Sequence, residues 1–192
     1  MNRLGVSLLL LTLSSVCFAV EALAPAAKFD QITDPAKRAV ALFEEAGKVI
    51  LSPRCLNCHP VDDSPRQGDL MRKHEPAVVR GAGGMGAAAM RCITCHGTTN
   101  FGRVPGNSKW FLAPAEMGWI GTSLGQICEQ IKDRKRNGDR SLQQLVEHMA
   151  NDDLVGWAWQ PGADRTPAPG TQKEFGQLIS AWADNGAQCP KP

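Results

Sequence analysis

Histidine is scarce in this sequence, and neither sign of charge dominates it. The 192 residues include four histidines, and the formal net charge is +2. A charge so close to zero gives no overall case for nucleic acid or an anionic membrane as a partner, because both select strongly basic surfaces. Internal repeats and periodic strands are also lacking. Beyond the N-terminal region no apolar run is long enough to cross a bilayer, so we expect no transmembrane span in the mature chain.

Residues 1–24 have the pattern of a secretory signal peptide. Arg3 precedes an almost wholly apolar stretch, Leu4–Leu13. Small residues that could precede the cleaved bond follow at Ala19, Ala22 and Ala24. The alternative is an uncleaved membrane anchor, but Leu4–Val20 is at the short limit for a spanning helix and contains serines. We therefore predict export to the periplasm, with residues 25–192 forming a single domain.

Two of the four histidines directly follow a Cys-x-x-Cys pair, in the segments Cys55–His59 and Cys92–His96. Two intervening residues place both thiols along one edge of a porphyrin, where they can add to its vinyl groups. The adjacent imidazole can then ligate the iron. The sequence therefore predicts two covalently bound haem c groups, with His59 and His96 as proximal ligands. The haem-attachment residues are Cys55, Cys58, Cys92 and Cys95.

Two other interpretations of the cysteine pairs remain. A four-cysteine zinc ribbon usually has about 15–20 residues between its pairs, and the gap from Cys58 to Cys92 is much longer. A redox dithiol would follow a strand in a βαβ unit and would not need the histidine. Both interpretations are weaker than haem attachment.

The distance between the two motifs constrains the architecture. The segment from Cys55 to Cys92 is too short for two tandem haem domains of about 100 residues each. We therefore expect both haems to lie close together in one domain.

The predicted fold is mainly α, a single compact domain of about four helices and long loops packed around the two haems. Helix-start signals stand at Asp34-Pro35, Thr122, Ser141 and Thr171. The first helix should run to about Leu51 with Val40, Phe43, Gly47 and Ile50 inward. The others should end near Lys135, Ala150 and Gly186.

Glycine and proline are concentrated between the predicted helices, in residues 60–70, 81–89, 97–121 and 157–170. So much irregular backbone is unusual in a domain, but a buried porphyrin offers apolar surface on which loops can pack. Residues 81–86 match Gly-x-Gly-Gly-x-Gly, a weak dinucleotide signal because no strand precedes it. The aromatic residues expected to pack on the haems are Trp110, Phe111, Trp119, Trp157, Trp159 and Trp182.

The remaining histidines, His74 and His148, are the candidate distal ligands. We expect a histidine pair at the first haem, and at the second His148 in preference to Met117. A methionine ligand would raise the reduction potential. Met149 adjoins His148, and the two point about 100° apart on a helix, so only one can face a given iron.

Cys128 and Cys189 are left over once haem attachment and removal of Cys17 are counted. An even remainder in an oxidising compartment predicts one disulfide, which would contribute about 4 kcal/mol. Two buried free thiols are the alternative. The nearby basic run, residues 132–136, is either a solvated helix end or a docking site for an acidic redox partner.

Four later segments, Gly121–Cys128, Glu147–Met149, Leu154–Trp157 and Gly186–Pro190, resemble small exported bacterial proteins of the isoquinoline 1-oxidoreductase subunit family. The resemblance spans most of the mature chain. It implies a haem protein that takes electrons from a molybdenum hydroxylase. An isoquinoline-oxidising activity is not carried over, because the chain has no Fe–S cysteine set beyond the haem motifs and no evident pterin site.

These patterns favour a periplasmic dihaem c-type cytochrome that passes single electrons between a redox donor and an acceptor. Such a carrier needs both irons six-coordinate. The alternative is a haem enzyme, a peroxidase or small-molecule reductase with one open iron position, where Arg165 or His74 could serve acid–base chemistry. A haem sensor or structural module is a third possibility, although no output domain is attached.

Overall fold

The computed structural model describes residues 21–162 and 164–192, and helices are its main regular elements. The prediction of a compact, mainly α fold is confirmed in this part of the chain. The helices are α1 (Pro35–Ile50), α2 (Pro53–Leu56), α3 (Leu124–Lys132), α4 (Leu142–Asn151), α5 (Asp153–Gly156) and α6 (Gln172–Asp184). Short 3₁₀ turns stand at Ala26–Phe29, Ala82–Gly84, Cys92–Thr94, Ala115–Met117 and Trp157–Trp159.

Two small antiparallel ladders connect the loops. In the first, β1 (Arg66–Gln67) pairs with β2 (Arg72–Lys73), with Arg66 opposite Lys73. In the second, β3 (Gly86–Ala87) pairs with β4 (Met90–Arg91), with Gly86 opposite Arg91. Because each strand has only two residues, the ladders brace loops and form no sheet that could carry a core.

The start of α1 follows the predicted capping chemistry. The Asp34 side chain accepts hydrogen bonds from the backbone N–H groups of Ala36 (2.9 Å) and Lys37 (3.3 Å), and Pro35 occupies the first helical position. The side chains that α1 buries form a stripe that is rotated slightly around the helix relative to the predicted one. Leu42 is buried, whereas Val40 is half-buried, because the helix has neighbours on two sides.

Two of the other predicted helices begin at their predicted caps, Ser141 and Thr171, whereas α3 has Ser123 as its cap and not the expected Thr122. Ser123 and Ser141 each form a reciprocal capping box with the glutamine three residues later, and Thr171 accepts from the Glu174 N–H. However, α3 ends at Lys132 and not near Lys135. Buried Asn137 donates to the main-chain oxygen of Ile131 (2.8 Å), which turns the chain away from the helix axis. The short helices α2 and α5 were not predicted.

The core lies where α6 packs against both α1 and α4. The rings of Phe43 on α1 and Trp182 on α6 have centroids 4.9 Å apart. Gly176 lets α6 approach α4 closely, since a Cβ there would lie 2.6 Å from the Ala150 Cβ. Cys128 on α3 is joined to Cys189, with Cα atoms 5.6 Å apart, so the predicted disulfide is confirmed and the free-thiol alternative is wrong.

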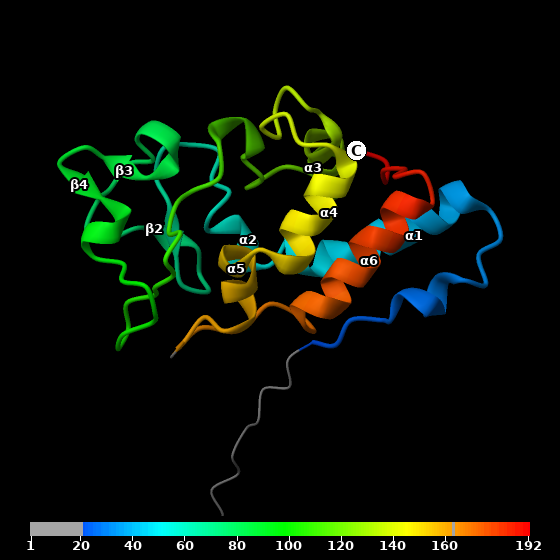
Figure 1. The fold of residues 1–192 in the computed structure, drawn as a ribbon, viewed down its shortest axis with the longest axis horizontal. Coiled ribbons are helices and arrows are strands. Elements are labelled where there is room, and N and C mark those ends of the chain that lie inside the picture. The colour runs from blue at the N-terminus through cyan, green and yellow to red at the C-terminus, as the bar shows by residue number, and fades with distance from the viewer. Residues whose placement is uncertain (1–20, 163) are drawn as a thin grey trace, which may run out of the picture.

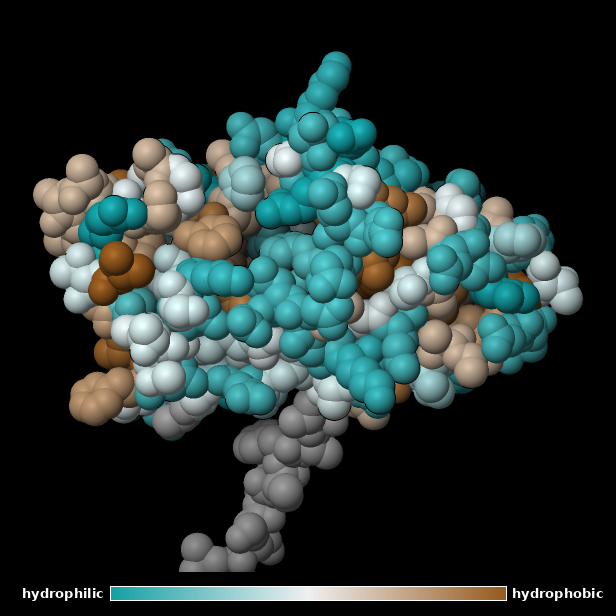
Figure 2. Space-filling view, viewed as in Figure 1, coloured by the Kyte–Doolittle hydropathy of each residue, from teal (hydrophilic) through white to brown (hydrophobic). Residues whose placement is uncertain are grey.

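The molecule has a helical half and a loop half. Figure 1 shows the long helices gathered on one side and residues 60–111, with β2, β3 and β4, on the other. In residues 57–111 no large apolar side chain is buried, whereas most of the exposed large apolar residues belong to this segment. Figure 2 shows brown and tan residues at the surface of this half. The loop half therefore lacks an apolar core of its own.

The residues just before α1 pack on the helical half. Leu23 is 6% exposed and belongs to the main core, and the Ala24 N–H donates to Glu45 of α1 at 2.7 Å. The main-chain oxygen of Glu21 accepts a hydrogen bond from the Gly170 N–H at 2.9 Å. The predicted signal sequence lies mostly outside the described residues, but its last four positions are part of this packed segment. Among the helices described, none is long and apolar enough to cross a membrane.

Candidate functional site: two adjacent cavities

Each Cys-x-x-Cys-His motif lies beside its own cavity. The first cavity has a volume of about 440 Å³ and is lined by Cys55, Cys58 and His59. The second has a volume of about 350 Å³ and is lined by Cys92, Cys95 and His96. Both volumes are typical of small-molecule and cofactor sites, roughly 300–1,000 Å³. The linings are largely apolar, with a few polar groups among them.

The two remaining histidines are divided between the cavities. His148, on α4, lines the first cavity, and His74, directly after β2, lines the second. The sequence analysis assigned His148 to the second motif, so the structure reverses that pairing. The reason is tertiary: α4 packs on α6 beside α1, which leads directly into the first motif. The β1–β2 hairpin meanwhile carries His74 to the second cavity.

Three histidines have the same hydrogen bond at Nδ1. The Nδ1 atoms of His59, His96 and His74 donate to the main-chain oxygens of Met117 (2.8 Å), Pro105 (2.7 Å) and Pro76 (2.9 Å). Because a carbonyl oxygen can only accept, Nδ1 must carry the proton and Nε2 must have the free lone pair. The Nδ1 atom of His148 lies 3.6 Å from the carboxylate of Asp152. This arrangement is typical of metal-ligating histidines.

Burial favours the neutral form of His59, His96 and His148 by lowering the pKa of each. It lowers the pKa of His59 to about 4, against the opposing effect of the Met117 carbonyl. Burial is also the main cause that lowers the pKa of His96 and of His148. A neutral ring keeps its Nε2 lone pair at neutral pH, which is the form that binds a metal ion.

A tryptophan stacks on each motif histidine. The rings of His59 and Trp119 are nearly parallel, with centroids 3.5 Å apart, and those of His96 and Trp110 are 4.7 Å apart. Trp157 meets Trp110 edge-on at 5.0 Å. The stacking fixes the orientation of both imidazoles. Trp159 packs on Phe175 and Trp182 lies in the helical core, so of the expected aromatic residues these two do not line the cavities.

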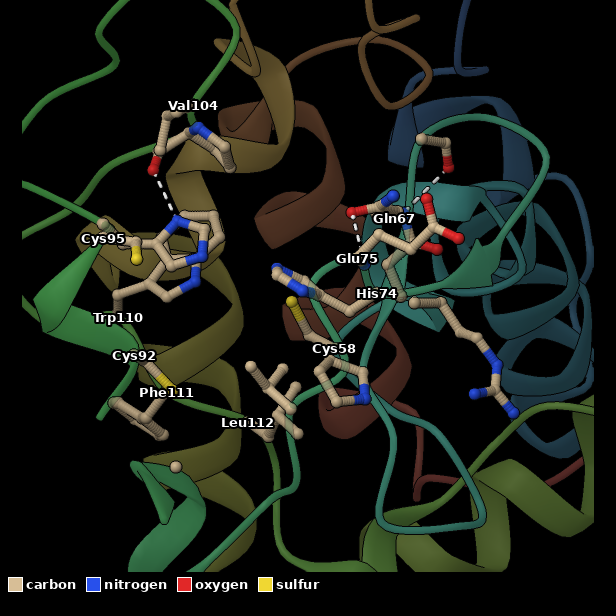
Figure 3. Close-up of a pocket in the computed structure, with 18 of the residues that line it drawn as sticks. Cys58, Gln67, His74, Glu75, Cys92, Cys95, Val104, Trp110, Phe111 and Leu112 are labelled. Carbon is tan, nitrogen blue, oxygen red and sulfur yellow. Dashed lines mark hydrogen bonds between the residues drawn. The ribbon is translucent and has the colours of Figure 1, made fainter. Parts of the chain in front are cut away.

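His74 and His96 face each other across the second cavity. Their ring centroids are 5.9 Å apart. Two imidazoles that ligate one metal from opposite sides need centroids about 6 Å apart, because each metal–nitrogen bond is about 2 Å. Figure 3 shows His74 pointing into the cavity, with Cys92, Cys95 and Trp110 on the opposite side. The donor set and its spacing therefore fit an iron with two histidine ligands.

Met117 is poorly placed as a distal ligand. Its main-chain oxygen accepts from Nδ1 of His59, which places its backbone on the Nδ1 side of that ring. Its side chain does line the first cavity, as does that of Met149. His148 therefore remains the better candidate opposite His59.

The two cavities share part of their lining, namely Arg54, Cys58, Phe111, Leu112 and Trp157. Next to this shared wall is the glycine-rich segment 81–86. Gly84 has a φ of 75°, and a Cβ there would lie 2.2 Å from the Leu112 main-chain oxygen. These glycines therefore let the loop approach the wall closely, which accounts for the Gly-x-Gly-Gly-x-Gly pattern without a dinucleotide.

The two cysteines of the first motif do not have the properties of a redox dithiol. Burial raises the pKa of Cys55 to about 12 and that of Cys58 to about 11, whereas reactive dithiols have lowered thiol pKa values. Nor do the described residues gather three or more His, Cys, Asp or Glu side chains into a group that could hold a metal ion by themselves. A four-cysteine zinc site is therefore not formed in this part of the chain.

Arg54 and the main-chain oxygens of Pro105 and Met117 also belong to the site, and the sequence analysis did not single them out. Arg54 directly precedes Cys55, which is the only signal that the sequence offers for it. The two oxygens come from loops, and their role depends on how those loops fold.

None of the protein-family models, curated proteins or solved structures compared with this chain matches it.

Proposed function

We propose that this chain is an exported dihaem c-type cytochrome that transfers single electrons between redox partners. One observation carries the proposal: each of two adjacent cavities combines one Cys-x-x-Cys-His motif with one further histidine. The chain has four histidines, and this arrangement uses all of them. If the two remaining histidines were placed by chance on the surface, one would not be expected beside each motif.

The number of ligands also supports the proposal. A porphyrin supplies four nitrogen ligands to its iron, so only two are needed from the protein. His59 and His148 would hold the iron in the first cavity, and His96 and His74 the iron in the second. When bound, each haem would supply an iron that cycles between the ferric and ferrous states by one electron.

The side chains around the histidines would position and tune the ligands. Hydrogen bonds from Nδ1 to carbonyl oxygens fix the tautomer and raise the basicity of Nε2, which favours the ferric state. The stacked Trp119 and Trp110 hold the imidazole planes. Since both cavities border Cys58, Phe111 and Leu112, the two haems would lie close enough to share electrons.

The resemblance to isoquinoline 1-oxidoreductase subunits makes an exported molybdenum hydroxylase a candidate electron donor. This part of the proposal rests on the sequence alone. The acceptor would be a second redox protein of the periplasm.

The test is a haem count and a visible spectrum of the protein expressed with periplasmic export. We expect two covalent haems by pyridine haemochrome, both low-spin when oxidised and when reduced by dithionite, and both indifferent to carbon monoxide. A variant with Cys92→Ala and Cys95→Ala should keep one haem. One haem that binds carbon monoxide would favour the enzyme with an open iron position, and a protein without haem would contradict the proposal.

A further inference from the structure

Arg54 is a buried cation between the two cavities. Its side chain is 1% exposed, and it lines both cavities. Its Nη2 atom donates to Asp69 at 2.6 Å. Its Nε and Nη1 atoms are buried and have no hydrogen-bond partner among the described residues. A buried N–H group without an acceptor costs about 1–3 kcal/mol, and more when the group is charged, so such groups usually mark the place of a missing partner.

The guanidinium is held in position before any ligand binds. Asp69, which engages Nη2, itself accepts hydrogen bonds from the Thr166 N–H (3.0 Å) and hydroxyl (2.7 Å). Asp69 thus links Arg54 of α2 to Thr166, which lies 97 residues beyond Asp69 in the sequence. The Asp69 carboxylate therefore holds one arm of Arg54 and is itself held by Thr166, while Nε and Nη1 of Arg54 remain without a partner in the described part of the chain.

The charges around the second cavity point to an anionic group. Arg66, Arg91, Arg103 and Arg165 line it together with Arg54, whereas Glu75 is its one acidic lining residue among those described. Arg66 already donates to Asp62 and to the Ser64 oxygen, and Arg103 pairs with Asp164. Arg54 differs from both in being almost fully buried with two nitrogen atoms unused.

The position of the cysteines decides which group would meet Arg54. A haem carries its two vinyl-derived substituents on one edge and its two propionates on the opposite edge. Cys92 and Cys95 lie on one side of the second cavity, and Cys58, of the wall shared with Arg54, lies on the other (Figure 3). The propionates are therefore the anionic groups that a haem attached through Cys92 and Cys95 would bring into the cavity that Arg54 lines.

We propose that Arg54 binds a propionate carboxylate of the haem in the second cavity through one of its two N–H groups without a partner among the residues described, at Nε or at Nη1. The inference rests on the proposed function, because it requires haem at Cys92 and Cys95. The Nε–H and Nη1–H groups of one guanidinium point in different directions, and each can donate one charge-assisted hydrogen bond to a carboxylate oxygen. Arg54 thus acts as a positioning residue that also neutralises a buried negative charge next to the iron.

Two consequences for the second haem follow. A fixed positive charge near the iron favours its reduced state, so Arg54 raises the reduction potential. Arg54 also keeps the propionate ionised, because a carboxylate beside a guanidinium has a lowered pKa. Without Arg54 the buried propionate takes up a proton more readily, and the potential then depends more steeply on pH.

The experiment compares Arg54→Gln with Arg54→Lys and with the matched control Arg66→Gln, from the same cavity. Spectroelectrochemical titrations of the dihaem protein at several pH values between 6 and 8 give the potential of each haem. In Arg54→Gln we expect the equilibrium constant for reduction of the second haem to fall at least tenfold, which is about 59 mV for one electron. We also expect its pH dependence to steepen. Arg54→Lys should restore most of the wild-type behaviour. Arg66→Gln should leave the pH dependence as in the wild type, because Arg66 is already engaged by Asp62 and Ser64.

The outcomes separate this inference from the proposed function. Wild-type protein without haem would contradict the proposed function itself. Two haems in every variant, with Arg54→Gln showing the same pH dependence as Arg66→Gln, would overturn the role of Arg54 and leave the cytochrome intact. If Arg54→Gln does not accumulate, Asp69→Asn provides the test, because freeing Nη2 for the propionate should raise the potential of the second haem and flatten its pH dependence. An unchanged potential in Asp69→Asn would overturn the inference.

Discussion

At the scale of single residues, the chemistry of the site depends on which ring nitrogen each histidine presents. His59, His96 and His74 all use Nδ1 for a main-chain oxygen, and His148 directs Nδ1 toward Asp152. Each therefore has Nε2 free. The oxygen atoms that accept from Nδ1 come from separate loops, so the sequence around each histidine does not predict them.

The distal histidines lead to a prediction that assigns each to a haem. His148→Ala should make the haem of the first motif high-spin, and His74→Ala the haem of the second, because each loses its sixth ligand. Covalent attachment should persist in both. The measurement is low-temperature electron paramagnetic resonance, made also in variants that lack the cysteines of one motif so that each signal can be assigned.

Met117→Leu and Met149→Leu are the controls for these variants, because both side chains line the first cavity. We expect them to leave both haems low-spin. A high-spin first haem in Met117→Leu, with an unaltered spectrum in His148→Ala, would show that methionine is the ligand.

At the scale of elements, α1 organises the N-terminal end of the fold. Its Glu45 accepts the Ala24 N–H and pairs with Lys48 at 3.0 Å. Burial by itself would raise the pKa of Glu45, but these two partners outweigh it and the pKa lies below its ordinary value. The carboxylate therefore stays ionised and ties the segment before α1 to the helix.

This packing predicts where the signal sequence is removed. Cleavage after Ala22 would remove Glu21, and cleavage after Ala24 would remove both Glu21 and the core residue Leu23. Cleavage after Ala19 would keep both residues. We therefore expect the mature protein to begin at Val20, as measured by intact-mass spectrometry of the periplasmic form. A mature chain that begins at Pro25 would disprove this expectation.

The same segment should contribute measurably to stability. Leu23→Ala deletes a buried side chain, which costs about 2–5 kcal/mol at fully enclosed sites and about 2 kcal/mol near a chain end. Thermal unfolding of the dihaem protein measures the difference. Leu70→Ala is the matched control, because Leu70 is 76% exposed and should leave the unfolding temperature nearly unchanged.

At the scale of the whole molecule, the two halves differ in how much buried apolar surface the protein itself supplies. The helical half has the core around α1, α4 and α6, and the disulfide closes it. Residues 57–111 bury no large apolar side chain among themselves. A segment of this length without an apolar core needs another source of buried surface, and under the proposed function the second haem provides it.

Loss of the second haem should therefore unfold the loop half alone. In a variant with Cys92→Ser and Cys95→Ser, we expect trypsin to cut between residues 60 and 111 at least tenfold faster than in the wild type. The first haem and the disulfide should remain. Peptide mapping by mass spectrometry locates the cuts, and equal rates in both proteins would contradict the prediction.

The matching variant of the first motif, Cys55→Ser with Cys58→Ser, should behave differently. The first cavity is lined by core residues of the helical half, such as Leu145 and Phe175. We expect its loss to lower the unfolding temperature of the whole protein.

Several features were predictable from short stretches of sequence because their causes are local. Asp34, Ser141 and Thr171 cap helices through backbone groups two or three residues away. Cys55–His59 and Cys92–His96 are each contained within one turn of chain. The Cys128–Cys189 pairing followed from counting, since four of the six mature cysteines belonged to the motifs.

The sequence by itself determined the helix starts and the two motif histidines, because these depend on residues only a few positions apart. It also determined the remaining disulfide, because only two cysteines are left once those of the motifs are assigned. The tertiary structure alone decided that His148 joins the first motif and His74 the second. It also decided that Arg54 lies in the wall between the cavities, with Nη2 on Asp69 and with Nε and Nη1 lacking a hydrogen-bond partner among the residues that the structure describes. Those features depend on how α4 packs on α6 and how Asp69 reaches Thr166. Contacts between residues so far apart in sequence arise only when the whole chain folds.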